Sequence, residues 1–371
     1  MIIIEHEKSK NYMNKKIILG SAGGAPTESV YNSLKISEDK EEIIGIGADK
    51  LELAQSDIKK KYLVPLATSQ NYIKTINNII ENEEPGFLHF QNDLEIYKLS
   101  KNRSSINNFN KLFYFPPHSD IENCSFKYSS YKKFLEAGIK VPKNMLIINY
   151  EDLIEAFKIL TKEHKEIWLR SNTIGGGGKG SLKTSNIEFA KNWIDHHDGW
   201  GEFIAAELLS KDTVTWQSIW YEGELVLSQA RKRYYWVHGN RAISGITGVT
   251  GVGEIYSDKD LDYLSIETIH SINKKPHGIY GVDFAYDFDG VPNPTEINAA
   301  RFFTTINFFT ECGVNFPEIY KNIFLYNKFP TFEDKFNPIS KKSFWFRSMD
   351  KKPKLLDELK ISEEVDEKYI Y

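Results

Sequence analysis

The chain has 371 residues, of which 41% are hydrophobic and 13% aromatic, so it is long enough for two or three domains with sizeable cores. Its formal net charge of −4 excludes a general attraction to nucleic acid or to a membrane surface, so any phosphate-binding site must be local. The sequence has no recognisable secretory signal, no apolar stretch of the ~20 residues needed to span a bilayer, and no metal-binding or disulfide-framework spacing of its two cysteines. These features predict a cytoplasmic protein.

Strand-like and helix-like segments alternate in the first third of the chain. An apolar run at residues 15–20 leads into a glycine-rich turn and a helix, and strand-like runs recur at 41–49, 62–69 and 86–93 with helical segments between them. This alternation is typical of a parallel α/β unit. The glycine turn lacks the G-x-G-x-x-G spacing of dinucleotide-binding folds, which argues against an oxidoreductase.

The pattern changes in the middle of the chain. A helix ends at Gly138, where a glycine is the expected C-terminal residue, and a second helix, a strand, a glycine-rich loop and a third helix follow. The stretches 213–237 and 280–302 then have the composition of antiparallel strands, with a hairpin turn at 287–290. The sequence therefore predicts a parallel α/β unit followed by α+β structure.

The glycine-rich loop, RSNTIGGGGKGSLKT at residues 170–184, has two interpretations. Such a loop is either a flexible surface turn or a segment whose bare N–H groups approach phosphate oxygens. Arg170 ends the preceding strand, where it is suited to clamp phosphate oxygens as a fork. Lys179 adds a second positive charge within the loop. The loop alone leaves both interpretations open.

An acidic hairpin follows in the sequence GVDFAYDFDGVPNPTEIN. Glu296 and Asn298 are two residues apart on one strand, so their side chains point to the same face, and Asp283 comes from the neighbouring strand. Two carboxylates and an amide oxygen are hard ligands that suit Mg²⁺. Asp287 and Asp289 in the turn are better interpreted as solubilising charges.

The order of these motifs resembles the ATP-grasp superfamily, in particular its carbamoyl-phosphate synthase large-chain and biotin-carboxylase branch. The resemblance covers about 124–313 and rests on Lys127 and the motifs KKFLEAGIKVP, IWLRSNTIGGGGKGSL, AAELLSKDTVTWQSIWYEGELV and VDFAYDFDG…TEINAAR, in that order. It implies a nucleotide site of Lys127, Arg170, Gly175, Gly176, Gly177, Gly178, Lys179, Gly180, Glu207, Leu209 and Asp212, with metal ligands Asp283, Glu296 and Asn298 and catalytic cations Arg170 and Arg301. The implied cofactors are ATP and Mg²⁺, with Mn²⁺ as an alternative metal.

Within that resemblance each part has a role. The loop from Gly175 to Gly180 would be a lid over the triphosphate, Glu207 and Leu209 would hold the adenine edge, and Asp212 would contact the ribose. The implied organisation is an N-terminal extension (1–12), a pre-ATP-grasp α/β domain (13–120), a small ATP-grasp subdomain with the lid (121–205), a large subdomain (206–330) and a C-terminal segment (331–371).

The chain also departs from the family pattern. Many members have E-x-N-x-R, whereas EINAAR contains one extra residue before Arg301. The extra residue changes the direction in which the side chain of Arg301 is expected to point. The chain lacks the His-Gln-Lys run of biotin carboxylases and has one ATP-grasp module instead of the two in carbamoyl-phosphate synthase. Neither biotin carboxylation nor the two-step synthesis of carbamoyl phosphate is therefore expected.

A cationic and aromatic stretch lies at residues 229–253. RNA binding is the weaker interpretation, because the chain is acidic overall. A strand facing an acidic substrate is favoured, and alternation would send Arg231 and Arg233 to one face and Lys232 to the other. The sequence does not decide which face lies at the site.

These inferences predict an ATP- and Mg²⁺-dependent ligase that converts a carboxylate to an acyl phosphate, which an amine or similar nucleophile then opens. The expected partners are these small-molecule substrates, without nucleic acid or membrane, and a homodimer is a family-level expectation. A small-molecule kinase and a non-catalytic ATP-binding module remain alternatives that would use the same site.

Overall fold

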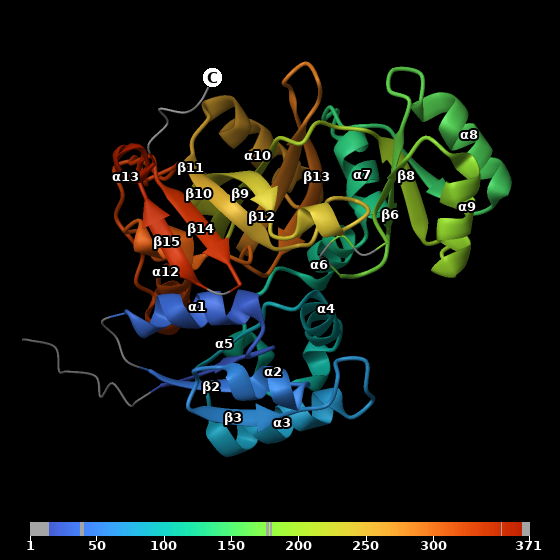
Figure 1. Ribbon diagram of the computed structural model, residues 1–371. Coiled ribbons are helices and arrows are strands. Elements are labelled where there is room, and N and C mark those ends of the chain that lie inside the picture. Colours follow the sequence, from blue (N-terminus) through green and yellow to red (C-terminus); the bar gives the residue numbers. More distant parts are fainter. Residues whose placement is uncertain (1–14, 38–40, 176–177, 179, 350, 366–371) are drawn as a thin grey trace, which may run out of the picture.

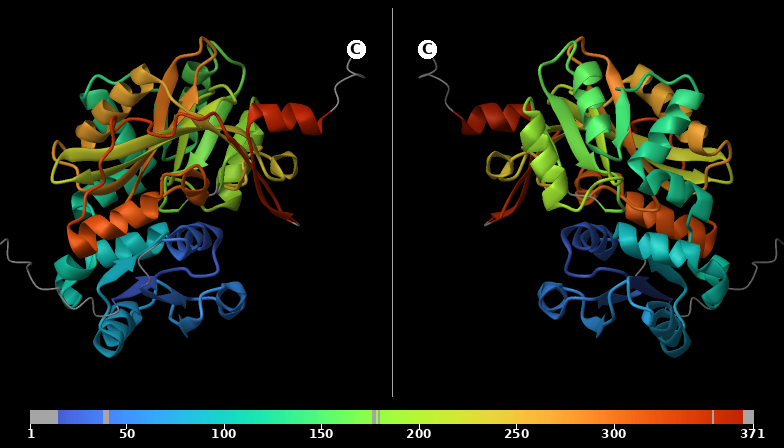
Figure 2. Two further views of the ribbon diagram at one scale, coloured as in Figure 1. Left: turned by 90° about the vertical axis from the view of Figure 1, so that its left-hand side faces the viewer. Right: turned by 90° about the vertical axis from the view of Figure 1, so that its right-hand side faces the viewer.

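The computed structural model describes residues 15–37, 41–175, 178, 180–349 and 351–365, and Figure 1 shows three sheets with their covering helices. None of the helices in this described part of the chain combines the length and apolarity of a membrane-spanning segment. The N-terminal unit lies beneath the other two parts, which Figure 2 shows from both sides.

The N-terminal unit contains a four-stranded sheet in the order β3-β2-β1-β4, and every pairing in it is parallel. Its strands are β1 (Lys16–Leu19), β2 (Glu42–Gly47), β3 (Lys60–Leu63) and β4 (Phe87–His89). Its helices are α1 (Ala25–Lys35), α2 (Lys50–Gln55), α3 (Tyr72–Glu83), α4 (Asp93–Lys101) and α5 (Phe109–Leu112), with a 3₁₀ turn, η1 (Arg103–Ser105). The predicted parallel α/β unit is confirmed.

The middle part is built on an antiparallel sheet in the order β5-β8-β6-β7. Its strands are β5 (Asn144–Ile147), β6 (Ile167–Ser171), β7 (Leu182–Thr184) and β8 (Phe203–Glu207), and its helices are α6 (His118–Ser125), α7 (Lys127–Glu136), α8 (Tyr150–Leu160) and α9 (Ile187–His196). Helix α7 ends before Gly138, whose φ of +74° is the left-handed conformation that glycine adopts most readily after a helix.

The third part is a seven-stranded sheet in the order β13-β12-β9-β10-β11-β14-β15, with antiparallel pairing throughout. Its strands are β9 (Thr213–Tyr221), β10 (Glu224–Trp236), β11 (Thr250–Tyr256), β12 (Gly278–Tyr286), β13 (Pro292–Ala299), β14 (Phe344–Ser348) and β15 (Lys351–Leu356). The helices and 3₁₀ turn are α10 (Lys259–Ile272), α11 (Asn307–Glu311), α12 (Phe316–Tyr326), α13 (Glu358–Glu364) and η2 (Gly239–Arg241). The predicted mixture of parallel α/β and antiparallel α+β structure is thus confirmed.

The C-terminal segment of the chain forms one end of this sheet, as strands β14 and β15. The sequence left the role of residues 331–371 open, and the structure shows that β14 extends the sheet by pairing with β11. Trp345 of β14 is buried and stacks on Phe308 with 5.8 Å between ring centroids. This hairpin is difficult to recognise in the sequence because β15 is an exposed edge strand with several lysines. Lysines on an edge strand discourage pairing with other chains.

The N-terminal unit is fixed against the large sheet by helix α1. Ser29 donates a hydrogen bond to Asn307 Oδ1 at 2.6 Å, and Thr310 donates to Ser33 Oγ at 2.8 Å. Because Asn307 and Thr310 belong to α11, these bonds join the first helix of the chain to a helix that follows the acidic hairpin. These bonds hold the first unit against the part of the chain that contains the large sheet.

The core at this junction contains a neutral histidine. His89 is 2% exposed and packs against the rings of Phe87, Phe302 and Tyr320. Burial lowers the pKa of His89 from 6.5 to about 4, because the charged imidazolium would lose its hydration.

We predict that this histidine makes folding sensitive to acid. The unfolded chain takes up a proton at His89 near pH 6.5 and the folded chain only near pH 4, so the stabilisation is present above pH 6.5 and is lost as the pH falls to about 4, a loss of about 3 kcal/mol. Urea unfolding of wild type and His89→Phe at several pH values would measure it. The difference in unfolding free energy between the two proteins should change across this window, and a constant difference would contradict the prediction.

Candidate active site

The candidate site is organised by one row of residues across the large sheet. Glu296 on β13 is paired with Asp283 on β12, Asp283 with Thr215 on β9, and Thr215 with Arg231 on β10. Residues paired in this way project from the same face of a sheet. Asn298 is paired with Gly281, one position further along the same face. The three predicted metal ligands therefore lie together.

Asp283 is held by hydrogen bonds from both sides. Asn298 Nδ2 donates to its Oδ2 at 2.9 Å, and the hydroxyl of Thr215 donates to its Oδ1. Burial raises the pKa of Asp283, and the facing charge of Glu296 raises it further, although Arg233 and Arg231 oppose these effects. This carboxylate is therefore in a position that a cation would stabilise.

Arg301 reaches this cluster despite the extra residue before it. Ala300 adopts a left-handed φ of +65°, which bends the chain after β13 and so accommodates the extra residue. Arg301 then donates hydrogen bonds to Asn298 Oδ1 and to the carboxylate of Asp93. The departure from E-x-N-x-R thus leaves the arginine beside the predicted metal ligands.

Asp93 is a site residue that the motif search missed. It is the first residue of α4 and follows β4 in the parallel sheet. Residues after the carboxyl ends of parallel strands commonly line ligand sites. That rule could have selected Asp93 from the sequence, but only the structure shows that it pairs with Arg301, which is 208 residues away in the chain.

The middle part of the chain contributes two cations from the opposite side. Lys127, the first residue of α7, has its Nζ 3.5 Å from Glu296 Oε2. Arg170 on β6 donates to the carbonyl of Thr295 at 3.3 Å, and its buried Nε has no hydrogen-bond partner among the described residues. The described residues thus leave one donor of Arg170 without an acceptor beside the acidic cluster.

Lys127 and Arg170 are tied to each other through the segment between β6 and the lid. Asn172, two residues after Arg170, accepts a hydrogen bond from the backbone N–H of Tyr128 at 2.8 Å. This hydrogen bond joins the start of α7, which carries Lys127, to the segment that follows Arg170.

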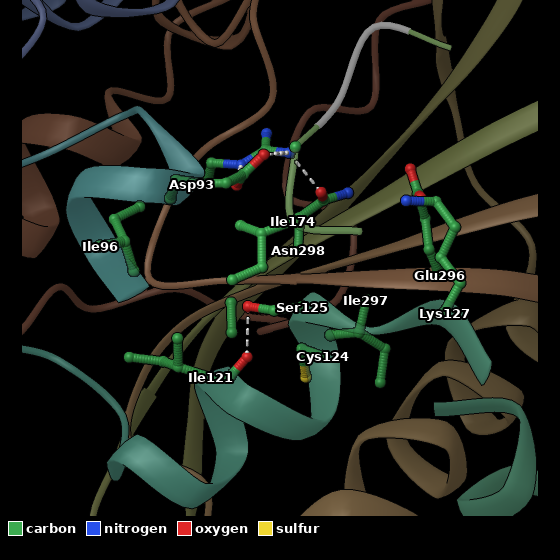
Figure 3. Close-up of a pocket in the computed structure, with 13 residues that line it drawn as sticks. Asp93, Ile96, Ile121, Cys124, Ser125, Lys127, Ile174, Glu296, Ile297 and Asn298 are labelled. Atoms are coloured by element: carbon green, nitrogen blue, oxygen red, sulfur yellow. Dashed lines mark hydrogen bonds and ion pairs between the residues drawn. The ribbon is translucent and has the colours of Figure 1, made fainter. Parts of the chain in front are cut away.

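A narrow cleft lined by Lys127, Glu296, Asn298 and Arg301 lies beside these groups, and the empty space of about 440 Å³ there includes open solvent. Figure 3 shows Lys127 beside Glu296 at one end, with Asp93 near Asn298 at the other. Apolar side chains line the remainder of the wall: Ile96, Ile121, Cys124, Ile174, Ile297 and Ala299. An apolar wall next to several charges strengthens electrostatic interactions with a bound ligand.

The acidic cluster of Asp283 and Glu296 has an excess of positive charge around it. Burial would raise the pKa of Glu296, but Lys127, Arg170 and Arg301 outweigh it and lower the pKa. The cations that interact with the acidic cluster are Lys127, Arg170, Arg231, Arg233 and Arg301, and the carboxylates are Asp93, Asp283 and Glu296. Five cations against three carboxylates leave a formal charge of +2, which suits a polyanion such as a triphosphate.

The donor set also fits Mg²⁺. Within the described ranges no group of three or more His, Cys, Asp or Glu residues forms a self-contained metal site. Mg²⁺ usually takes only one or two protein carboxylates and completes its shell with water and phosphate oxygens. Asp283 and Glu296 meet that requirement. The amide oxygen of Asn298 is held by Arg301 in this conformation, so it would have to be released to join them.

The structure also shows which side chains of the cationic strand β10 lie on the same face as the acidic cluster. Arg231 and Arg233 on β10 lie on the face of Asp283, whereas Lys232 lies on the other face, where its Nζ is 3.8 Å from Asp212 Oδ1. Arg233 is close to Trp236, with 3.7 Å from its guanidinium carbon to the ring centroid. Neither arginine has a carboxylate within ion-pair distance in the part of the chain that the structure describes.

The predicted lid is described only in part. Gly176, Gly177 and Lys179 lie outside the described residues, so their predicted phosphate contacts remain predictions. Gly178 has a φ of +71°, and a Cβ at this position would lie 2.9 Å from Ile246 Cγ2. Glycine is therefore required where the lid passes the loop between β10 and β11.

The residues predicted to contact adenine and ribose are less closely grouped. Glu207, at the end of β8, accepts a hydrogen bond from the backbone N–H of Lys143 at 2.8 Å, and Leu209 follows it half-buried. Asp212 is not brought to the acidic cluster and instead lines a separate hollow that also contains Tyr256 and Tyr286. Its predicted ribose contact therefore has no support from the position of its side chain.

Comparison with known proteins finds similarity in structure but no match to a family model and no significant match to a curated sequence. Among solved structures, a carboxyaminoimidazole ribonucleotide synthase from Aspergillus clavatus, complexed with ATP, has a TM-score of 0.67 at 13% identity, covering 90% of this chain and 82% of that one.

Two other enzymes are similarly related in structure. A Campylobacter jejuni biotin carboxylase, in a β-γ-ATP complex, has a TM-score of 0.66 at 17% identity, covering 91% of this chain and 76% of that one. The L-amino acid ligase from Bacillus licheniformis has a TM-score of 0.63 at 11% identity, covering 90% and 79%. The likeness extends over nearly the whole described chain. The protein therefore shares the fold of these enzymes, the ATP-grasp fold that the sequence resemblance predicts.

Proposed function

We propose that the protein is an ATP- and Mg²⁺-dependent ligase that activates a small-molecule carboxylate as an acyl phosphate for attack by an amine or similar nucleophile. The observation that carries the proposal is the pair of carboxylates, Asp283 and Glu296, with Lys127 and Arg170 from the middle part of the chain close enough to lower the pKa of Glu296. The cations suit the triphosphate, and the two carboxylates suit the metal that accompanies it.

The cations and the carboxylates would have different roles in binding the nucleotide. Lys127 and Arg170 would bind phosphate oxygens, with the unpaired Nε of Arg170 providing a donor that no described residue uses. Asp283 and Glu296 would hold Mg²⁺, which would supply positive charge beside the phosphates. Arg301, held next to Asn298, would stabilise negative charge on the transferred phosphoryl group.

The proposed reaction has two steps. A carboxylate oxygen of the substrate attacks the γ-phosphorus of ATP, the bond from that phosphorus to the β–γ bridging oxygen breaks, and ADP leaves. The nucleophile then attacks the acyl carbon, phosphate leaves with the bonding electrons, and the amine loses a proton to solvent. Because the carboxylate is already ionised at neutral pH, the first step needs positioning and charge neutralisation and does not need a general base.

The names of the structural neighbours support this chemistry but do not identify the substrate. One neighbour is an L-amino acid ligase, and another was solved with ADP and 5-aminoimidazole ribonucleotide. We infer that the acceptor is a small molecule with an amine or an equivalent nucleophile. ADP release measured with pooled carboxylates and amino acids would identify the pair, and a stable phosphorylated product without any need for an amine would instead indicate a kinase.

We predict that Glu296→Gln abolishes this turnover whereas Asp287→Asn preserves it. Glu296 faces the proposed metal, so loss of its charge should reduce kcat/KM for ADP release about 100-fold or more. Asp287 lies in the same hairpin but pairs with the exposed Lys140, so its variant should stay within about threefold of wild type. Full ADP release by Glu296→Gln would refute the metal assignment.

We also predict that Lys127→Met weakens nucleotide binding without metal. Loss of a charge-assisted hydrogen bond to phosphate, worth about 1.5–3 kcal/mol, should raise the Kd for ADP in EDTA about 10-fold or more. Lys133→Met is the matched control, because Lys133 is on the same helix and pairs with Glu136 at the surface. Calorimetric titration of ADP measures both variants. Equal affinities for the two would exclude Lys127 as a phosphate contact.

A further inference from the structure

Asp283 is the centre of a hydrogen-bonded chain that crosses the large sheet. Thr215 donates to one of its carboxylate oxygens and Asn298 to the other. Each of these donors receives a hydrogen bond from an arginine: Arg231 Nη2 donates to Thr215 Oγ1 at 2.8 Å, and Arg301 Nη2 donates to Asn298 Oδ1. The carboxylate therefore has the same arrangement on both sides.

The chemistry of arginine fixes the direction of these bonds. A guanidinium group donates hydrogen bonds and cannot accept them, whereas a hydroxyl has one hydrogen to donate. When Arg231 donates to Thr215, the single hydrogen of Thr215 is free to point at Asp283. In the same way, Arg301 occupies the amide oxygen of Asn298 and turns its NH₂ group toward Asp283.

Arg231 is itself held rigidly. It is 2% exposed, its Nη1 donates to Thr250 at 2.9 Å, and its guanidinium carbon lies 4.7 Å from the ring centroid of Phe303. Gly253 leaves room for it, since a Cβ there would lie 3.0 Å from Arg231 Cδ. A side chain buried to this degree is poorly placed to touch a substrate, so its function must be exerted through its neighbours.

We propose that Thr215 and Arg231 are positioning residues that hold the carboxylate of Asp283 in the orientation that receives the metal. The inference rests on the proposed function, because it assumes that Asp283 is a metal ligand. Each carboxylate oxygen has about two lone-pair directions, so one hydrogen bond to each leaves another direction for a cation. Groups that orient metal ligands in this way commonly contribute 10- to 100-fold to metal affinity.

We call the hydrogen bonds from Arg231 to Thr215 and from Thr215 to Asp283 the relay. The chain provides a matched control for it. Thr213 is two residues before Thr215 on β9 and accepts a hydrogen bond from Arg233 Nη1 at 2.9 Å. It is paired with Ala285 on β12, where Thr215 is paired with Asp283. A valine at either position removes one hydroxyl that an arginine contacts, but only the hydroxyl of Thr215 donates a hydrogen bond to the carboxylate of Asp283.

The first experiment measures Mn²⁺ binding to the full-length protein saturated with ADP, with free Mn²⁺ quantified by its electron paramagnetic resonance signal. Thr215→Val should weaken Mn²⁺ binding about 10- to 100-fold, while Thr213→Val and the conservative Thr215→Ser should remain within about threefold of wild type. The Kd for ADP in EDTA should be unchanged in all three variants, because the relay acts on the metal ligand. Wild-type Mn²⁺ affinity in Thr215→Val would overturn the proposal.

Two further variants complete the test. Arg231→Met should reproduce the loss seen with Thr215→Val, while Arg231→Lys, which can still donate to Thr215, should recover part of the affinity. If Arg231→Met does not fold, the comparison of the three threonine variants still decides the proposal. Asp283→Asn distinguishes failure of the proposed metal site from failure of the positioning role. Unchanged Mn²⁺ binding in Asp283→Asn would refute the metal site, and this inference with it. Weaker Mn²⁺ binding in Asp283→Asn but not in Thr215→Val would refute only the positioning role of Thr215 and Arg231.

Discussion

The carboxylates of Asp283 and Glu296 face each other on neighbouring strands, and the surrounding structure compensates for their repulsion. Like charges at directly paired positions of a sheet are destabilising. Here the pair is surrounded by cations from two of the three parts of the fold, the middle part and the large sheet, and hydrogen bonds to Asp283 distribute its charge further. An arrangement that needs so many compensating groups is more readily explained by a bound metal and polyanion than by folding stability.

The positions of the three parts follow from that cluster. The N-terminal unit provides Asp93 to hold Arg301, the middle part provides Lys127 and Arg170, and the large sheet provides the carboxylates. The cleft therefore exists only where the three parts meet, and a shift of any one would change the charge balance. Polar contacts between α1 and α11 help to keep the first part and the large sheet in register.

The sequence predicted much of the fold because its periodic patterns agree with local structure. The parallel unit, the antiparallel strands and the hairpin of Asp283 and Glu296 all depend on alternation and on turn residues within short windows. The β14–β15 hairpin was not predicted, because its edge strand is rich in lysine and its stabilising contact, Trp345 on Phe308, is made with a distant helix. Propensity does not reveal a contact of that kind.

For the site, the sequence by itself determined which residue types could hold a metal and a triphosphate, and that Glu296 and Asn298 would share a face. Only the tertiary structure decided that Asp93 pairs with Arg301, that Arg231 lies behind Thr215, and that Asp212 points to a different hollow. The reason is physical: strand periodicity fixes directions over a few residues, whereas charge pairs between segments hundreds of residues apart depend on how the sheets and helices pack.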